Sequence, residues 1–136
     1  MKPLMTLDQE RSQRAWECVK NVPNEKIAGY TSVVKSSASL IMNNGLMQTL
    51  VYLAAKSNQK RNEYEYLQEH LCKWVNDVSF GGDSTKAQFP QAMESLYKCS
   101  SEQYMSSTRE VVAFIGWLRQ MADAQKSMAK SDEAKE

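Results

Sequence analysis

Glycine, proline and long apolar runs are all scarce in this 136-residue chain. Five glycines and three prolines are too few for the frequent turns of an all-β fold. No apolar run approaches the roughly 20 residues that cross a bilayer. The first residues also become polar too soon for a signal peptide. We therefore expect a cytoplasmic protein that has no membrane partner.

Groups that bind metals or attack substrates are also few. The three cysteines, Cys18, Cys72 and Cys99, are far apart and lack the CxxC spacing of zinc sites, so we expect reduced thiols. His70 is the only histidine, and its neighbours indicate a surface or half-buried position. The carboxylates are dispersed singly, as on solvated helix faces. The sequence therefore predicts no enzyme activity, no metal and no cofactor.

Helix-forming residues dominate, and apolar residues recur at helical spacing. We expect helices over about 6–22, 25–39, 45–56, 63–78, 85–98 and 101–126. Thr6 and Gln9 fit a capping box at the start of the first helix. The Asn43-Asn44-Gly45 run indicates a sharp turn before the third, because glycine accepts a positive φ. The expected fold is all-α: a single compact helical bundle of about five to six helices over residues 1–126, and a charged, disordered tail over 127–136.

Charge is unevenly distributed although the net charge is only +1. Residues 1–61 contain nine Lys or Arg and four Asp or Glu, whereas residues 62–136 contain eight and twelve. Between Lys26 and Asn62 there is no acidic residue. A basic half suits a phosphate backbone, and a dipolar subunit could stack head to tail with copies of itself. Chance scatter in a short chain is the alternative.

The basic half also supplies polar side chains that suit a nucleic-acid backbone. Lysines, amides and hydroxyls contact phosphate and sugar without reading bases. The candidates of this kind are Lys26, Lys35, Lys56, Asn43, Asn44, Gln48 and Thr49. The alternative is an ordinary solvated surface on which Gln48 or Thr49 caps or braces a helix.

Three stretches resemble the small-subunit family of type III-B CRISPR (Cmr) complexes. The central stretch contains Val34-Lys35-Ser36, Leu40-Ile41 and Asn44-Gly45-Leu46-x-Gln48-Thr49-Leu50. The closing stretch is Tyr104-x-x-x-Thr108-x-Glu110-x-x-Ala113-Phe114-x-x-Trp117-Leu118-Arg119-x-x-Ala122, and Arg14-Ala15 with Cys18-Val19 fits the first helix of the family. The similarity spans about residues 11–56 and 101–124. Ala38-Ser39 and Met47 depart from the family pattern, which often has a Pro and a small residue there.

The resemblance implies a non-catalytic small subunit of an RNA-targeting ribonucleoprotein in antiviral defence. Such subunits stack in several head-to-tail copies along the filament, beside the backbone subunits, and stabilise the guide RNA–target RNA duplex through backbone contacts. The implied leading RNA contacts are Arg14 and Lys35, and the secondary ones are Lys20, Lys26 and Lys56. The expected interface residues are Asn44, Gly45, Gln48, Thr49, Gly116 and Arg119.

Other readings of the same residues stay open. Gly116 would permit a close helix crossing, either inside the domain or between subunits. Arg109 is followed by Glu110, so the two could be paired with each other. Two alternative functions are a helical adaptor that binds only proteins and the equivalent small subunit of a type III-A (Csm) complex.

Overall fold

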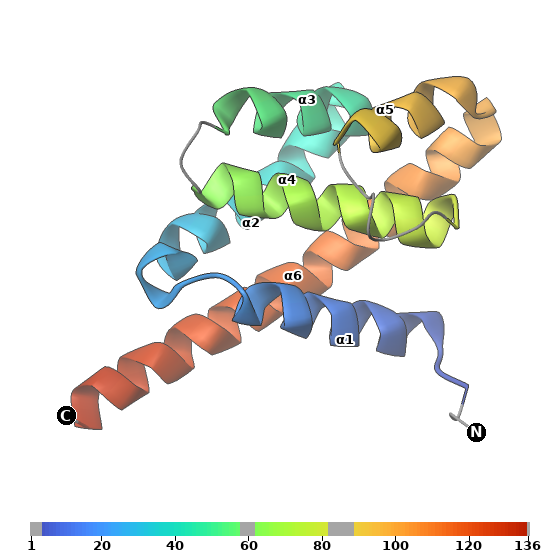
Figure 1. Cartoon of the computed structure of the whole chain (residues 1–136). Helices are drawn as coiled ribbons and strands as arrows, with labels where there is room; N and C mark the ends of the chain where they lie inside the picture. Colours follow the sequence, from blue (N-terminus) through green and yellow to red (C-terminus); the bar gives the residue numbers. More distant parts are fainter. Residues whose placement is uncertain (1–3, 58–61, 82–88, 136) are drawn as a thin grey trace.

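Six α-helices dominate the computed structural model, which describes residues 4–57, 62–81 and 89–135 (Figure 1). They are α1 (Leu7–Lys20), α2 (Ile27–Asn44), α3 (Leu46–Lys56), α4 (Glu63–Trp74), α5 (Phe89–Lys98) and α6 (Ser101–Lys135). A 3-10 turn, η1 (Asn24–Lys26), precedes α2, and a π-helical turn, η2 (Val75–Ser79), continues α4. Over these residues there is no strand, which confirms the predicted all-α class.

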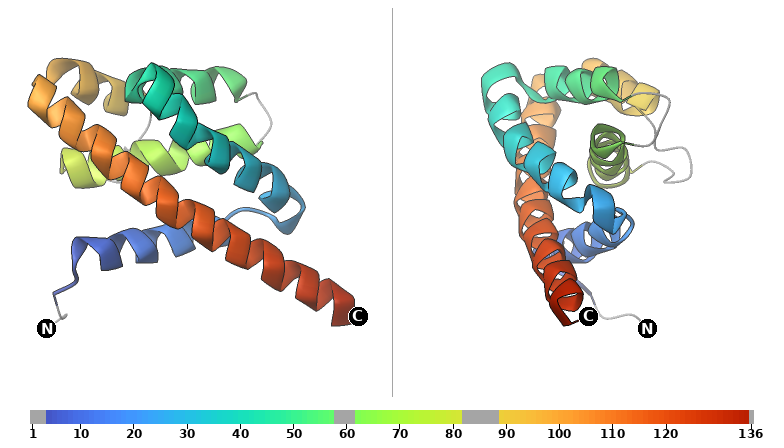
Figure 2. Two further views of the ribbon diagram at one scale, coloured as in Figure 1. Left: turned by 180° about the vertical axis from the view of Figure 1, so that it is seen from behind. Right: turned by 90° about the vertical axis from the view of Figure 1, so that its left-hand side faces the viewer.

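Helix α6 is the longest of the six helices and runs across the whole bundle (Figure 2). Its 35 residues correspond to roughly 52 Å of helix. It packs against α1 and α2, while α4 packs against α2 and α3, and α5 against α3 and α4. Seen from behind, α6 crosses the bundle diagonally, and its C-terminal part projects beyond α1 and α2 (Figure 2). In the described part of the chain, no helix is both long and apolar enough to span a membrane.

The core follows the apolar stripe expected on the last helix. Val111, Ile115 and Leu118 are buried on α6, as predicted. Phe114 is buried beside them and stacks on Trp74 of α4, with ring centroids 4.3 Å apart and planes 8° apart. Burying large aromatic side chains supplies much of the stability of a small core. The central contact between α4 and α6 is therefore aromatic.

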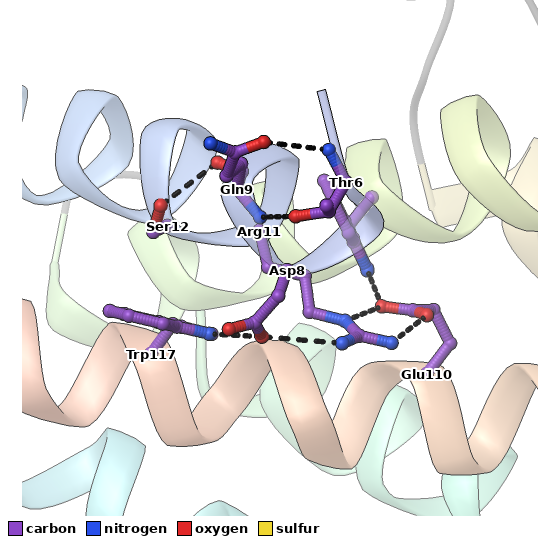
Figure 3. Close-up of polar contacts among 8 residues, drawn as sticks. Thr6, Asp8, Gln9, Arg11, Ser12, Glu110 and Trp117 are labelled. Carbon is purple, nitrogen blue, oxygen red and sulfur yellow. Dashed lines mark hydrogen bonds and ion pairs between the residues drawn. The ribbon is translucent and has the colours of Figure 1, made fainter. Parts of the chain in front are cut away.

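Two local predictions are confirmed by the backbone. The amide of Gln9 donates to Thr6 Oγ1 (3.1 Å) and the amide of Thr6 to Gln9 Oε1 (2.8 Å), which is the expected capping box (Figure 3). Gly45 separates α2 from α3 with φ 90° and ψ 164°. This region is open essentially to glycine alone. Tyr104 of α6 contacts this turn, because its hydroxyl oxygen accepts a hydrogen bond from the backbone amide of Met47 (3.1 Å).

Several helix boundaries differ from the prediction. Helix α2 continues to Asn44 instead of ending near Ser39, and it ends at Gly45, whose amide donates to the Ile41 carbonyl (2.8 Å). Helix α6 continues to Lys135, so the predicted end near Lys126 is wrong. The expected start of the fifth helix near residue 85 lies outside the described residues. The division of the chain into a domain (1–126) and a tail (127–136) stays a prediction.

Candidate nucleic-acid interface

Arg14, a leading candidate from the sequence, is held inside the fold. Its Nη1 lies 3.0 Å from Asp77 Oδ2, and its guanidinium lies 5.6 Å from the ring centroid of Trp74. Only 33% of the Arg14 side chain and 12% of the Asp77 side chain are exposed. A phosphate would have to displace this half-buried carboxylate. The geometry therefore favours Arg14 as a link between α1 and the end of α4.

The hollow beside Arg14 is also poorly suited to an anion. It has a volume of about 700 Å³ and is lined by Glu10, Glu17 and Asp77 together with Arg14 and apolar side chains. Three carboxylates against one guanidinium repel a phosphate. The predicted RNA contact at Arg14 is therefore not supported by its surroundings.

Lys35, the other leading candidate, lies on the exposed side of α2. Its Nζ is 3.3 Å from Asp123 Oδ1 of α6, and about half of each side chain is exposed (45% and 49%). Ion pairs this exposed contribute little to stability. Lys35 can therefore exchange its carboxylate partner for a phosphate at small cost.

The secondary candidates lie at the ends of helices. Lys20 ends α1, Lys26 ends η1, and Lys56 ends α3. Lys20 Nζ lies 5.9 Å from the ring centroid of Trp16, and Lys56 Nζ lies 5.8 Å from that of Tyr52. The C-terminal ends of α1 and α3 and the turn η1 point toward the same side of the molecule, the left in Figure 1. The projecting part of α6 lies on that side too.

The turn between α2 and α3 contains four expected interface residues, and they differ in exposure. Asn44 and Gln48 are exposed, and Gly45 is half-buried under the Tyr104 hydroxyl. Thr49 is only 1% exposed, and its hydroxyl donates to the Gly45 carbonyl (2.9 Å). Thr49 therefore braces the start of α3 and has no surface to offer a partner.

The two expected interface residues of α6 are both on the surface. A Cβ added at Gly116 would meet nothing within 4 Å, so no helix of the described chain crosses closely at this point. A close helix crossing at Gly116 was considered either inside the domain or between subunits. Only a crossing between subunits is compatible with this open space. Arg119 is exposed one turn further on, and Arg109 is exposed two turns before Gly116.

A partly buried polar network that the sequence did not reveal joins α1 to α6. Arg11 donates to Glu110 through Nε and Nη2, each at 2.7 Å (Figure 3). Trp74 Nε1 donates to the same carboxylate (3.1 Å), and Trp117 Nε1 donates to Asp8 Oδ1 (2.8 Å). The hydrogen bonds to Glu110 raise the pKa of Arg11 above its ordinary value. Glu110 is therefore engaged by Arg11 and Trp74.

His70 and two of the three cysteines, Cys18 and Cys72, are buried, whereas Cys99 is half-buried. Burial raises the pKa of the Cys18 and Cys72 thiols to about 12, so both stay protonated near neutral pH. His70 is 8% exposed, and its Nδ1 lies 2.8 Å from the hydroxyl oxygen of the buried Tyr30. The expected surface or half-buried position of His70 is therefore wrong. Among the described residues there is no group of three side chains placed to hold a metal ion.

An apolar hollow lies between α3 and α5. It has a volume of about 450 Å³ and is lined by Met47, Gln48, Val51, Tyr52 and Met93. Val51 is 46% exposed and Tyr52 is 39% exposed. Exposed apolar side chains gathered in one patch are typical of protein contacts.

Comparison with known proteins identifies relatives of the whole helical domain. A family profile described as "CRISPR-associated protein (Cas_Cmr5)" matches residues 7–125. The fold is similar to that in the X-ray crystal structure of a CRISPR-associated Cmr5 family protein from Thermus thermophilus, with a TM-score of 0.67 and 20% sequence identity. That alignment covers 89% of this chain and 97% of the Thermus chain. At this identity the structural likeness supports the fold, and the profile supports the family.

Proposed function

This chain belongs to the Cas_Cmr5 family of CRISPR-associated proteins, and we propose that it is the non-catalytic, RNA-binding small subunit of its complex. Family membership makes it a subunit of a type III-B Cmr complex, which is the first of the two CRISPR assignments considered from the sequence. In the proposed role, several copies stack along the filament and stabilise the guide RNA–target RNA duplex. They do so by contacting its phosphates.

The observation that carries the RNA-binding role is the grouping of cations on one side of the bundle. Lys20, Lys26 and Lys56 lie at the ends of three elements that point the same way (Figure 1). None of them forms an ion pair with any residue that the structure describes. Lys35 adds a fourth cation with a weakly held partner. Cations free to exchange counterions are what a phosphate backbone requires.

Support for a non-catalytic role comes from where the reactive groups lie. General acid–base or nucleophilic catalysis needs a group within reach of a substrate. His70, Cys18 and Cys72 are all buried, and both thiols have a pKa of about 12. The subunit therefore contributes binding, and the target RNA would be cut elsewhere in the complex.

The RNA-binding role is tested by replacing Lys26 and Lys35 together with alanine. We expect the assembled complex to bind target RNA roughly fivefold to tenfold more weakly at physiological salt, because two phosphate contacts are lost. The slope of log affinity against log salt should become shallower by about 2, since each phosphate contact contributes about 1. Filter binding over a salt series measures both quantities.

Lys98→Ala is the matched control. Lys98 pairs with Glu94 on α5, away from η1 and the α6-facing side of α2. Its removal should leave affinity and slope unchanged. If the Lys26/Lys35 variant enters the complex and binds RNA with the wild-type affinity and slope, the subunit is a protein scaffold only.

Stacking of copies is supported by two apolar patches at opposite ends of the molecule. One is the hollow between α3 and α5, and the other is the N-terminal segment, where Leu4 is fully exposed and Met5 is 43% exposed. Helices α3 and α5, whose side chains line the hollow, lie at the top of the bundle, and the N-terminal segment lies at the bottom (Figures 1 and 2). A contact between different patches joins copies head to tail and continues into a filament when its rotation does not close.

Val51→Arg tests the stacking contact. The substitution places a charge on an exposed position of the hollow, so the fold should tolerate it while association weakens roughly tenfold. Analytical ultracentrifugation of the free protein and the copy number in assembled complexes both report the change. Met128→Arg, at a similarly exposed position on the projecting part of α6, is the control. Equal association of both variants and wild type would exclude the α3–α5 hollow as the stacking surface.

A further inference from the structure

Helix α6 carries a stripe of basic residues along its outer side. Successive members are separated by three, four or seven residues, which places them on one face of a helix. The α6 stripe consists of Arg109, Gly116, Arg119, Asp123, Lys126 and Lys130. Its last member follows its first by 21 residues, or roughly 31 Å of helix. Five of its members are exposed and Lys126 is half-buried.

The four cations of the α6 stripe are not neutralised by the rest of the described chain. Arg109 does not pair with its neighbour Glu110, which is bound by Arg11 and Trp74. No ion pair with a described residue engages Arg119, Lys126 or Lys130 either. The single carboxylate of the stripe, Asp123, is neutralised by Lys35 of α2. With respect to the described side chains, the stripe therefore presents four positive charges without an ion-pair partner.

The shape of this surface also suits an extended anionic strand. Seen from behind, α6 crosses in front of α4 and α1 and lies beside α2 (Figure 2). Gly116 has open space above it, so a ligand can approach the helix backbone between Arg109 and Arg119. A long, straight row of cations on a rigid helix matches the repeating charge of a nucleic-acid backbone.

We propose that the α6 stripe binds an RNA phosphate backbone and that Lys126 and Lys130 extend this contact beyond the family's shared domain. The family profile ends at residue 125, so membership alone does not imply a role for these two lysines. The side-chain Nε2 of Gln125 donates to Asn24 Oδ1 (3.4 Å), which anchors the start of the extension against η1, next to Lys26. The inference rests on the proposed RNA-binding function and assigns it a second surface.

The test is target-RNA binding by the assembled complex containing full-length Lys126→Ala/Lys130→Ala subunit. The probe is a labelled target RNA complementary to the guide, titrated over a salt series. We expect roughly fivefold weaker binding and a shallower salt slope, with Lys126→Arg/Lys130→Arg restoring both. Alanine favours helix, so the loss cannot be attributed to melting of α6. Ser127→Ala/Ser131→Ala, in the same segment, should behave like wild type.

For a second variant we expect a higher affinity for target RNA. Asp123→Asn removes the one carboxylate of the stripe and releases Lys35, so target RNA should bind roughly twofold to threefold more tightly. Structural damage would not produce tighter binding.

The outcomes separate this inference from the proposed function. If the Lys26/Lys35 variant weakens RNA binding but the Lys126/Lys130 variant does not, the α6 stripe is not an RNA surface and the proposed function stands. If neither variant changes the affinity or the slope, both fail. If the Lys126/Lys130 variant reduces incorporation of the subunit while RNA affinity per incorporated copy is unchanged, the stripe binds an acidic protein surface instead.

Discussion

Replacing Glu110 with alanine should lower the free energy of unfolding by about 3 kcal/mol, because the largely buried Arg11 guanidinium and the buried Trp74 Nε1 both lose this acceptor. Glu110 accepts two hydrogen bonds from the Arg11 guanidinium and one from Trp74 Nε1. Only 20% of the Arg11 side chain and 11% of the Glu110 side chain are exposed, so water replaces the lost partner poorly. Urea denaturation followed by circular dichroism measures the change.

Glu94→Ala is the matched control for this prediction. It also removes a carboxylate from an ion pair, here with Lys98, but both side chains are more than half exposed. Its transition midpoint should stay close to that of the wild type, since exposed pairs contribute little. A Glu110→Ala protein as stable as the Glu94→Ala protein would show that the Arg11–Glu110 contact does not hold α1 on α6.

The local features of this fold could be predicted from the sequence. The Thr6–Gln9 capping box and the glycine turn at Gly45 depend on residues within four positions of each other. The apolar stripe of α6 depends on helical periodicity. Each of these features depends on residues that are close together in the sequence, so it can be predicted from a single sequence.

The partners of charged residues could not be predicted in the same way. Arg14 binds Asp77 and Arg11 binds Glu110, and these residues are 63 and 99 positions apart. Adjacency instead suggested that Arg109 could pair with Glu110, although neighbours on a helix point in different directions. The family resemblance implied an RNA contact for Arg14, whereas Arg109 was not among the expected contacts. The structure pairs Arg14 with Asp77 and leaves Arg109 exposed, while RNA contacts at either residue stay predictions.

The end of α6 and the position of His70 were missed for other reasons. Apart from Met128, the residues beyond Lys126 are small or charged, so the apolar periodicity that marks a buried helix fades there, although the helix continues to Lys135. His70 is surrounded by polar residues in the sequence, but the side chain opposite it in space is Tyr30, forty positions away. Hydrogen bonding to that hydroxyl allows a polar ring to be buried. Both cases depend on contacts that one sequence does not display.

Replacing Trp74 with alanine should destabilise the protein by about 4 kcal/mol, in the range for a buried aromatic side chain. Trp74 is 1% exposed, stacks on Phe114 and donates to Glu110. Trp74→Phe should cost clearly less, because a stacked ring is kept while the donor is lost. Trp16→Ala is the control, since Trp16 is only half-buried on α1 and its loss should lower the stability less than Trp74→Ala does. The midpoints of urea transitions compare the three variants.

Trp74→Phe also separates stability from RNA binding. Trp74 lies beneath the Arg14 guanidinium, so a smaller ring loosens one of the two contacts of Arg14 while Asp77 still holds the other. If Arg14 serves the fold, complexes containing Trp74→Phe subunit should keep the wild-type affinity and salt slope for RNA. A steeper salt slope in this variant would mean that the released Arg14 reaches a phosphate. That result would return Arg14 to the RNA interface that the sequence first suggested for it.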